Sequence, residues 1–65
     1  MNLKALYHLA HDNPDAIRKL AIQQGLDPVV SLGVVKLMLA NDGNLASLSQ
    51  KQKHHYEMTI KPLIE

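Results

Sequence analysis

The sequence predicts an all-α fold, a single domain over residues 1–65 in which about four short helices form a bundle around an aliphatic core. Three observations predict this fold. Apolar residues recur at three- and four-residue spacing, residues that favour helix N-caps precede the apolar stretches, and glycine follows two of them. The chain has two tyrosines but neither phenylalanine nor tryptophan, so the core must be built from aliphatic side chains. The helices are expected at about 3–11, 14–24, 28–41 and 50–61.

The first helix is expected to follow Asn2, because an asparagine side chain can accept a hydrogen bond from a backbone N–H of the first turn. It should end near His11, ahead of a polar run that begins at Asp12. Residues at helical spacing define the stripe that should face the core. This stripe consists of Leu3, Leu6, Tyr7 and Ala10.

The second helix is expected to begin at Pro14 with Asn13 as its N-cap, because proline at the first helical position needs no partner for an N–H. Gly25 should end this helix in a left-handed conformation, and Leu26 is the apolar residue that commonly follows such a cap. The expected inward stripe consists of Ile17, Leu20, Ala21 and Gln24.

The third helix should open at Asp27–Pro28 and close at Asp42–Gly43, and it is apolar around most of its circumference. Its many β-branched residues would also suit a buried strand, but its length and the capping residues at both ends favour a helix. Leu37 is expected in the core, and only one strip of the helix is small or polar. That strip consists of Val29, Gly33, Lys36 and Ala40.

A helix that is apolar on nearly all sides must be surrounded by other apolar surface. Two arrangements satisfy this requirement. The third helix is the central helix of the bundle, or a second chain covers part of its surface. Small domains often complete their cores by oligomerisation, so both arrangements stay open at this point.

The fourth helix should begin directly after Ser49, which forms a capping-box pattern with Gln52. Proline cannot continue a helix without loss of a hydrogen bond, so Pro62 should kink or end this helix near Lys61. The expected inward face consists of Tyr56, Ile60 and Leu63.

Composition narrows the function classes. Without cysteine the chain can form neither disulfides nor thiolate metal sites, a composition that suits the cytoplasm. Seven basic residues against six acidic ones give a net charge of +1, which does not indicate a nucleic-acid or anionic membrane ligand. No stretch approaches the roughly 18–20 apolar residues that span a membrane, so we expect no membrane partner.

No catalytic or metal-binding motif is recognisable. The aspartates fall at expected helix ends, where capping accounts for them. His8 and His11 are three residues apart, but this spacing alone lacks the further ligands that zinc needs. Glu57 lies four residues from both Lys53 and Lys61 and would pair with them on an exposed helix face. We therefore expect a protein that is not an enzyme and that uses no cofactor or metal.

The sequence around the turn at Gly25 matches the helix-turn-helix pattern of DNA-binding proteins only in part. Ala21, Gly25 and Leu26 match part of that pattern. The helix after the turn, however, would present Val29 and Val30 to the DNA, and aliphatic side chains cannot read the polar edges of the bases. A tight corner between two helices with a glycine C-cap accounts for the turn.

The remaining charged feature is the run KQKHH at the start of the fourth helix, where cations oppose the helix dipole. We define the basic edge as the residues of this region that could contact an anion or a phosphate backbone. The basic edge consists of Lys51, Lys53, His54, His55 and Lys61.

Two function hypotheses follow from these patterns. The first is a non-enzymatic protein–protein interaction domain that binds another protein or itself, self-associating as a homodimer through an apolar helix face. The second is a weak nucleic-acid-binding module that uses the basic edge. The apolar third helix is a larger physical anomaly than two lysines at a helix start, and it favours the first hypothesis.

Overall fold

A computed structural model describes residues 2–65 of the chain, and it confirms the all-α fold. Within these residues there is no β-strand. The helices follow the predicted order, except that the fourth helix divides into three consecutive segments, of which the middle one is a π-helix. The elements are α1 (Leu3–Asp12), α2 (Pro14–Gln23), α3 (Pro28–Ala40), the 3₁₀ turn η1 (Leu45–Ser47), α4 (Gln50–His55), the π-helix η2 (Tyr56–Ile60) and α5 (Lys61–Ile64).

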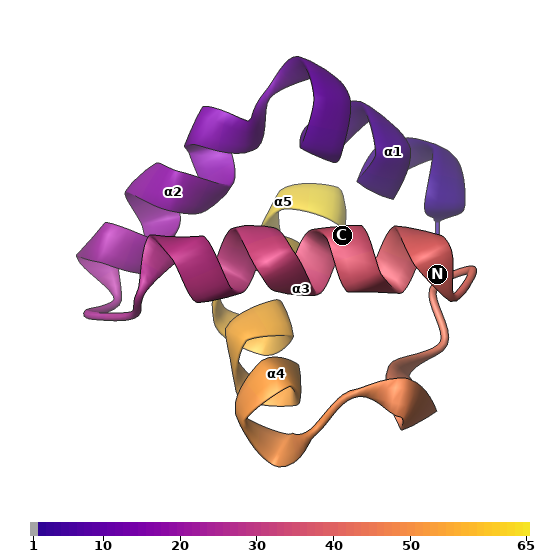
Figure 1. The fold of residues 1–65 in the computed structure, drawn as a ribbon. Helices are drawn as coiled ribbons and strands as arrows, with labels where there is room; N and C mark the ends of the chain where they lie inside the picture. Colours follow the sequence, from indigo (N-terminus) through magenta and orange to yellow (C-terminus); the bar gives the residue numbers. More distant parts are fainter. Residues whose placement is uncertain (1) are drawn as a thin grey trace.

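Helix α3 crosses the middle of the molecule (Figure 1). Helices α1 and α2 pack against it on one side, and α4 with η2 packs against it on the other. The strip expected to be small or polar is the exposed one, and the remaining positions of α3 are buried or half-buried. Of the two arrangements left open by the sequence, the structure therefore has α3 as the central helix, covered by the other helices of the same chain.

The predicted N-caps form at three of the four helix starts. Asn2 and Asp27 each accept a hydrogen bond from a backbone N–H of the following turn, at 3.0 and 2.9 Å. Ser49 and Gln52 bond reciprocally, with the Ser49 Oγ accepting at 3.2 Å and the Gln52 Oε1 accepting at 2.8 Å. Asn13 occupies the N-cap position of α2, but its side chain makes no capping bond. Asn13 is also the C-cap of α1, so this one residue ends α1 and precedes the first residue of α2.

Helices α2 and α3 end in the same type of C-terminal cap. Gly25 is left-handed, with φ of 73°, and the Leu26 N–H donates to a carbonyl of the last turn of α2 at 2.8 Å. After α3 the left-handed position falls on Asp42, with φ of 54°, and the N–H of Gly43 donates back at 2.7 Å. This 6→1 bond is the mark of a Schellman cap, which satisfies carbonyls that the helix leaves unpaired.

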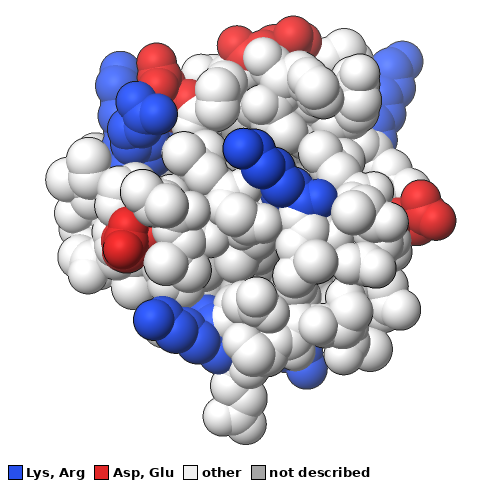
Figure 2. All heavy atoms as spheres, in the orientation of Figure 1, with Lys and Arg blue, Asp and Glu red and all other residues white. Residues whose placement is uncertain are grey.

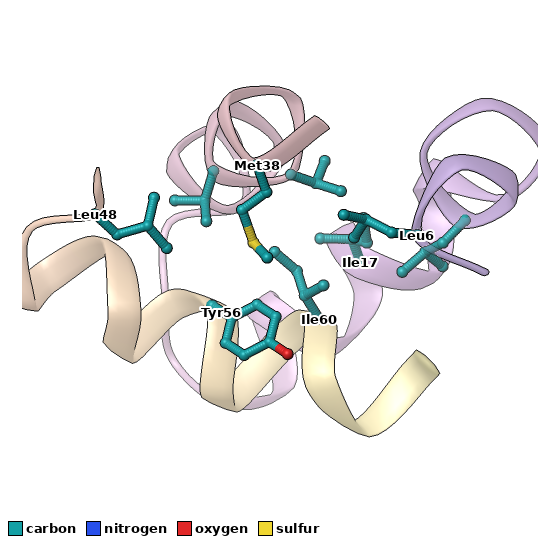
Figure 3. Packing of buried hydrophobic residues seen from close by; sticks show 9 residues of the cluster. Leu6, Ile17, Met38, Leu48, Tyr56 and Ile60 are labelled. Atoms are coloured by element: carbon teal, nitrogen blue, oxygen red, sulfur yellow. The ribbon is translucent and has the colours of Figure 1, made fainter. Parts of the chain in front are cut away.

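The core lies between α3 and the helices on either side of it. Figure 3 shows Met38 reaching from α3 toward Ile60, with Ile17 and Leu48 on opposite sides of its side chain. Met38, Ile17 and Ile60 are fully buried, which confirms the expected aliphatic core. The buried cluster consists of Leu6, Leu9, Ile17, Val34, Val35, Met38, Leu48, Tyr56 and Ile60.

The inward face of α1 is rotated from the expected stripe. Leu6 is buried as expected, but its companion is Leu9, whereas Leu3 and Tyr7 are 41% and 54% exposed. Leu6 and Leu9 are three residues apart and share one face, so the stripe that contacts the core is narrower than the apolar surface of the helix. Part of the apolar surface of α1 is therefore left uncovered.

Two further expected core positions are wrong, each for a local reason. Gln24 is exposed because it caps the end of α2 and lies outside its packed turns. Leu63 is 39% exposed, and Ile64 packs against the core in its place. The wider turns of η2 lie between the start of this helical run and Leu63, so the face that continues the buried stripe shifts along the chain.

The π-helical turns have causes in the sequence. The Lys61 N–H donates to the Tyr56 carbonyl, five residues earlier. The hydroxyl of Thr59 lies 2.6 Å from the carbonyl oxygen of His55 and competes for it, as threonine hydroxyls do inside helices. Pro62 has no N–H to donate, and it lies in the first turn of α5, where none is needed. The helix therefore changes its hydrogen-bond pattern before Pro62 and then resumes.

Candidate functional site

The structure separates the predicted basic edge into exposed and buried members. Lys51, Lys53, His54 and Lys61 are exposed. His55, expected to be exposed beside them, is only 3% exposed. It lies on the side of α4 that faces α3, one helical turn after Lys51. His55 therefore does not contribute to a surface that could contact a phosphate group.

The two lysines at the start of α4 point away from each other. Lys51 and Lys53 are two residues apart, which corresponds to about 200° of rotation around a helix. On the face shown in Figure 2, positive and negative side chains are scattered among uncharged ones, without a broad patch of either sign. The described residues of the basic edge are thus distributed around a helix instead of being gathered on one face.

His55 belongs to a buried polar cluster that the sequence did not predict. We define this cluster as Ser31, His55 and Thr59, which join α3 to α4 and η2. The distance from Ser31 Oγ to His55 Nδ1 is 2.7 Å, and that from Thr59 Oγ1 to Ser31 Oγ is 3.1 Å. Ser31 and Thr59 are fully buried. Every buried side-chain nitrogen or oxygen in the described residues has a hydrogen-bond partner, so the cluster is satisfied internally.

The environment of His55 disfavours its charged form. Burial lowers the pKa of His55 from the usual 6.5, and the positive charges of Lys51 and His54 lower it further. Asp27, at the N-terminus of α3, acts in the opposite direction as the smallest of these effects. The nearby hydroxyl of Tyr56 has a raised pKa, because it is buried and lies beside Glu65.

A serine hydrogen-bonded to a histidine is also the geometry of an activated nucleophile. Such a nucleophile must be reachable by a substrate, but the Ser31 side chain is fully buried. No pocket opens onto it or elsewhere over residues 2–65. The Ser31–His55 hydrogen bond joins α3 to α4 within the core.

Two residues of the cluster escaped sequence reasoning, although signals for both were present. Ser31 lies on the same face of α3 as Val34 and Met38, three and seven residues later, so the spacing of the buried stripe includes it. Thr59 follows His55 by four residues and thus lies one turn further along the same helix. A hydroxyl within an aliphatic stripe indicates a polar partner on the facing helix.

The histidines of α1 make local contacts only. His8 Nδ1 lies 2.9 Å from Asp12 Oδ2, both exposed, and the His11 ring lies 4.2 Å from that of Tyr7. Within residues 2–65, no three histidine or carboxylate side chains come together in a way that could hold a metal ion.

Five of the six exposed large apolar side chains lie in two regions, and the sixth, Leu45, lies apart from them on η1. The first, which we call the apolar flank, consists of Leu3 and Tyr7, one turn apart on α1, and Leu63 on the adjoining α5. The second, which we call the corner, consists of Ile22 and Val29, on either side of the turn between α2 and α3. Ile22 and Val29 are 63% and 73% exposed. These two regions each offer more than one large apolar side chain to a partner.

None of the helices in residues 2–65 has the length and apolar character required to cross a lipid bilayer. Comparisons with protein-family models, with curated proteins and with solved structures found no match.

Proposed function

We propose that this chain is a non-enzymatic protein–protein interaction domain that self-associates through the apolar flank. The observation that carries the proposal is the uncovered part of the apolar stripe of α1. Leu3 and Tyr7 lie one turn apart on a single helix face, and Leu63 lies on the helix that packs beside it. The proposal places the domain in the cytoplasm, which the absence of cysteine suits.

The composition of the apolar flank fits a contact between two copies. Tyrosine is enriched among the residues that dominate binding energy, because it buries a large ring and can still donate its hydroxyl. A single helix face can form an isologous interface, in which the same residues meet across a twofold axis. Tyr7 is also stacked on His11, so less side-chain freedom is lost when the ring is covered.

The size of the apolar flank sets the expected strength of association. A stable interface buries about 800 Å² on each partner. That is a large share of a molecule whose entire accessible surface is 4078 Å². Three partly exposed side chains supply much less, so the dimer should form reversibly and only at high protein concentration.

The concentration dependence of thermal stability tests this function. Because association stabilises only the folded state, the Tm should rise with protein concentration, and sedimentation equilibrium should show a monomer–dimer equilibrium. The double variant Leu3→Ser/Tyr7→Ser should abolish the concentration dependence, because both positions are exposed in the monomer and apolar in the interface. The control, Ile22→Ser/Val29→Ser, changes apolar residues at the corner that are more exposed than Leu3 and Tyr7, and it should keep the concentration dependence.

Three outcomes would contradict the proposal. A chain that stays monomeric at the highest concentration, with a constant Tm, does not self-associate. Loss of association in the control pair alone would assign the interface to the corner instead of the apolar flank. Salt-sensitive DNA binding that is weakened by Lys51→Gln/Lys53→Gln, without self-association, would establish the nucleic-acid alternative.

A further inference from the structure

The contact between α3 and the C-terminal helical run contains one polar connection within an otherwise aliphatic interface. Ser31 of α3 bonds to His55 of α4 and to Thr59 of η2, and all three side chains are buried. Tyr56 and Ile60, from the same run, contribute buried apolar side chains to the core. The buried polar cluster is thus the only hydrogen-bonded link in the described residues between the side chains of α3 and those of the run at 50–64.

The hydrogens of the cluster can be counted in each protonation state. When His55 is charged, Nδ1–H must donate to Ser31 Oγ, the Ser31 hydroxyl then donates to Thr59, and the Thr59 hydroxyl donates to the His55 carbonyl. The neutral ring allows this arrangement and also the reverse one, in which the Ser31 hydroxyl donates to Nδ1. Protonation therefore breaks no hydrogen bond of the cluster, and its effect is electrostatic.

The charges that face His55 oppose protonation overall. From α4, Lys51 and His54 repel a positive ring, whereas Asp27 at the start of α3 attracts it more weakly. From η2, the side chain that meets the cluster is the uncharged Thr59. A positive ring that is 3% exposed also loses most of its hydration. The ring regains that hydration, and moves away from α3, when residues 50–64 separate from the rest of the domain.

We propose that the buried polar cluster is a proton-sensitive latch, which holds residues 50–64 on α3 more firmly when His55 is neutral and makes their release easier when His55 takes up a proton. This inference concerns regulation of the fold and goes beyond the proposed self-association. Release uncovers the side of α3 that carries Met38, and it is permitted by the connector from Asn41 to Ser49, which contains only the short turn η1.

The direction of the pH effect follows from linkage. Above pH 7.5 or so, His55 is neutral in both the docked and the released state and makes no difference between them. The usual pKa of an exposed histidine ring is 6.5. As pH falls through this value, His55 binds a proton in the released state but not in the docked state. The docked state therefore loses stability with falling pH, until pH passes below the lowered pKa of docked His55. Below that pKa His55 is charged in both states, and the loss of stability of the docked state stays constant.

Amide hydrogen exchange, measured residue by residue at pH 7.5 and pH 5.0 and corrected for intrinsic rates, tests the latch. Acidification should speed exchange in residues 50–64 more than in α1 and α2. The increase should be about tenfold for each unit by which the pKa of docked His55 lies below that of the released ring. An NMR titration of the His55 ring in the same sample should give a midpoint below pH 6.5.

Two variants and a control identify the group responsible. His55→Asn keeps an amide near the position of Nδ1 but cannot take up a proton, so the selective effect of acid should vanish. Lys51→Glu, at an exposed position, should reduce the effect because the new charge favours protonated His55 in the docked state. His54→Asn changes the neighbouring exposed histidine and should leave the selective effect in place.

The latch is overturned by any of three results. These are a His55 midpoint at or above pH 6.5, an acid-induced loss of protection that is equal in all helices, or an undiminished selective effect in both His55→Asn and Lys51→Glu. If His55→Asn does not fold, the wild-type titration and Lys51→Glu decide the matter alone. Each measurement is made at concentrations where the chain is monomeric, so failure of the latch and failure of self-association are separate results.

Discussion

Three consecutive residues of α3 have very different surroundings. Met38 is fully buried at the centre of the core, Leu37 is half-buried at its edge, and Lys36 is exposed. The sequence predicts the exposed strip of this helix correctly, because small and polar residues mark it. It does not distinguish Leu37 from Met38, since both are apolar and the helix is apolar on nearly every side.

The three positions should respond differently to truncation. Met38→Ala should lower the free energy of unfolding by about 2–5 kcal/mol, because a cavity forms where no neighbour can fill it. Leu37→Ala should cost less, and Lys36→Ala should change stability by no more than about 0.5 kcal/mol. Urea denaturation of the three variants measures these differences. Equal losses at positions 36 and 38 would show that the packing of α3 is misassigned.

The buried polar cluster shows where prediction from residue types fails. His55 follows three hydrophilic residues, and composition alone assigns it to the same exposed edge as Lys51 and Lys53. Its burial depends on Ser31, which lies 24 positions earlier and on another helix. Local patterning contains no information on such a pairing, whereas the caps at Asn2 and Ser49 involve neighbours in sequence and were predictable.

At the scale of the elements, the helix ends were more predictable than the helix faces. The Schellman cap at Gly25 needs only the local sequence, and it forms as expected. The inward face of α1 depends on where α3 and α5 lie, and the expected stripe was rotated. The π-helical turns of η2 depend jointly on Thr59 and Pro62, and the sequence indicated only the effect of the proline.

Replacement of Gly25 and of Gly33 by alanine should change the free energy of unfolding in opposite directions. A Cβ atom at either Gly25 or Gly33 would meet no atom within 4 Å, so neither substitution creates a clash. Gly33 lies inside α3, where alanine should raise the free energy of unfolding by about 0.5–1 kcal/mol. Gly25 has φ of 73°, where alanine should lower it by roughly 1–2 kcal/mol.

Thermal unfolding of Gly33→Ala and Gly25→Ala, compared at equal protein concentration, checks both signs. An increase in Tm for Gly25→Ala would mean that the α2–α3 turn does not adopt the left-handed cap. A decrease for Gly33→Ala would mean that another chain contacts this strip of α3.

At the scale of the whole molecule, the core is shared between the two halves of the chain. Leu6 and Ile17 approach α3 from one side, and Tyr56 and Ile60 approach it from the other. Neither half can cover α3 alone. The domain should therefore unfold cooperatively at neutral pH, where neutral His55 favours the docked position of residues 50–64.

A chain that ends at Ser49 should be much less stable than the whole chain. It keeps all of α1, α2 and α3 but lacks Tyr56 and Ile60, and so it leaves one side of a largely apolar helix in water. Circular dichroism should show less helix than in the whole chain and a thermal transition at much lower temperature. Addition of a synthetic peptide of residues 50–65 should restore helicity. An unchanged Tm in the shortened chain would contradict the central role assigned to both sides of α3.

The central position of α3 has a consequence for synthesis on the ribosome. Translation delivers α1, α2 and α3 first, and the residues that cover the second side of α3 follow afterwards. At ordinary rates the ribosome needs roughly 1–3 s to add residues 50–64. Until those residues are available, α3 lacks the segment that covers its second side, and an uncovered apolar helix is the kind of surface that chaperones bind and that favours aggregation. Native structure can therefore form only after synthesis of this region is complete.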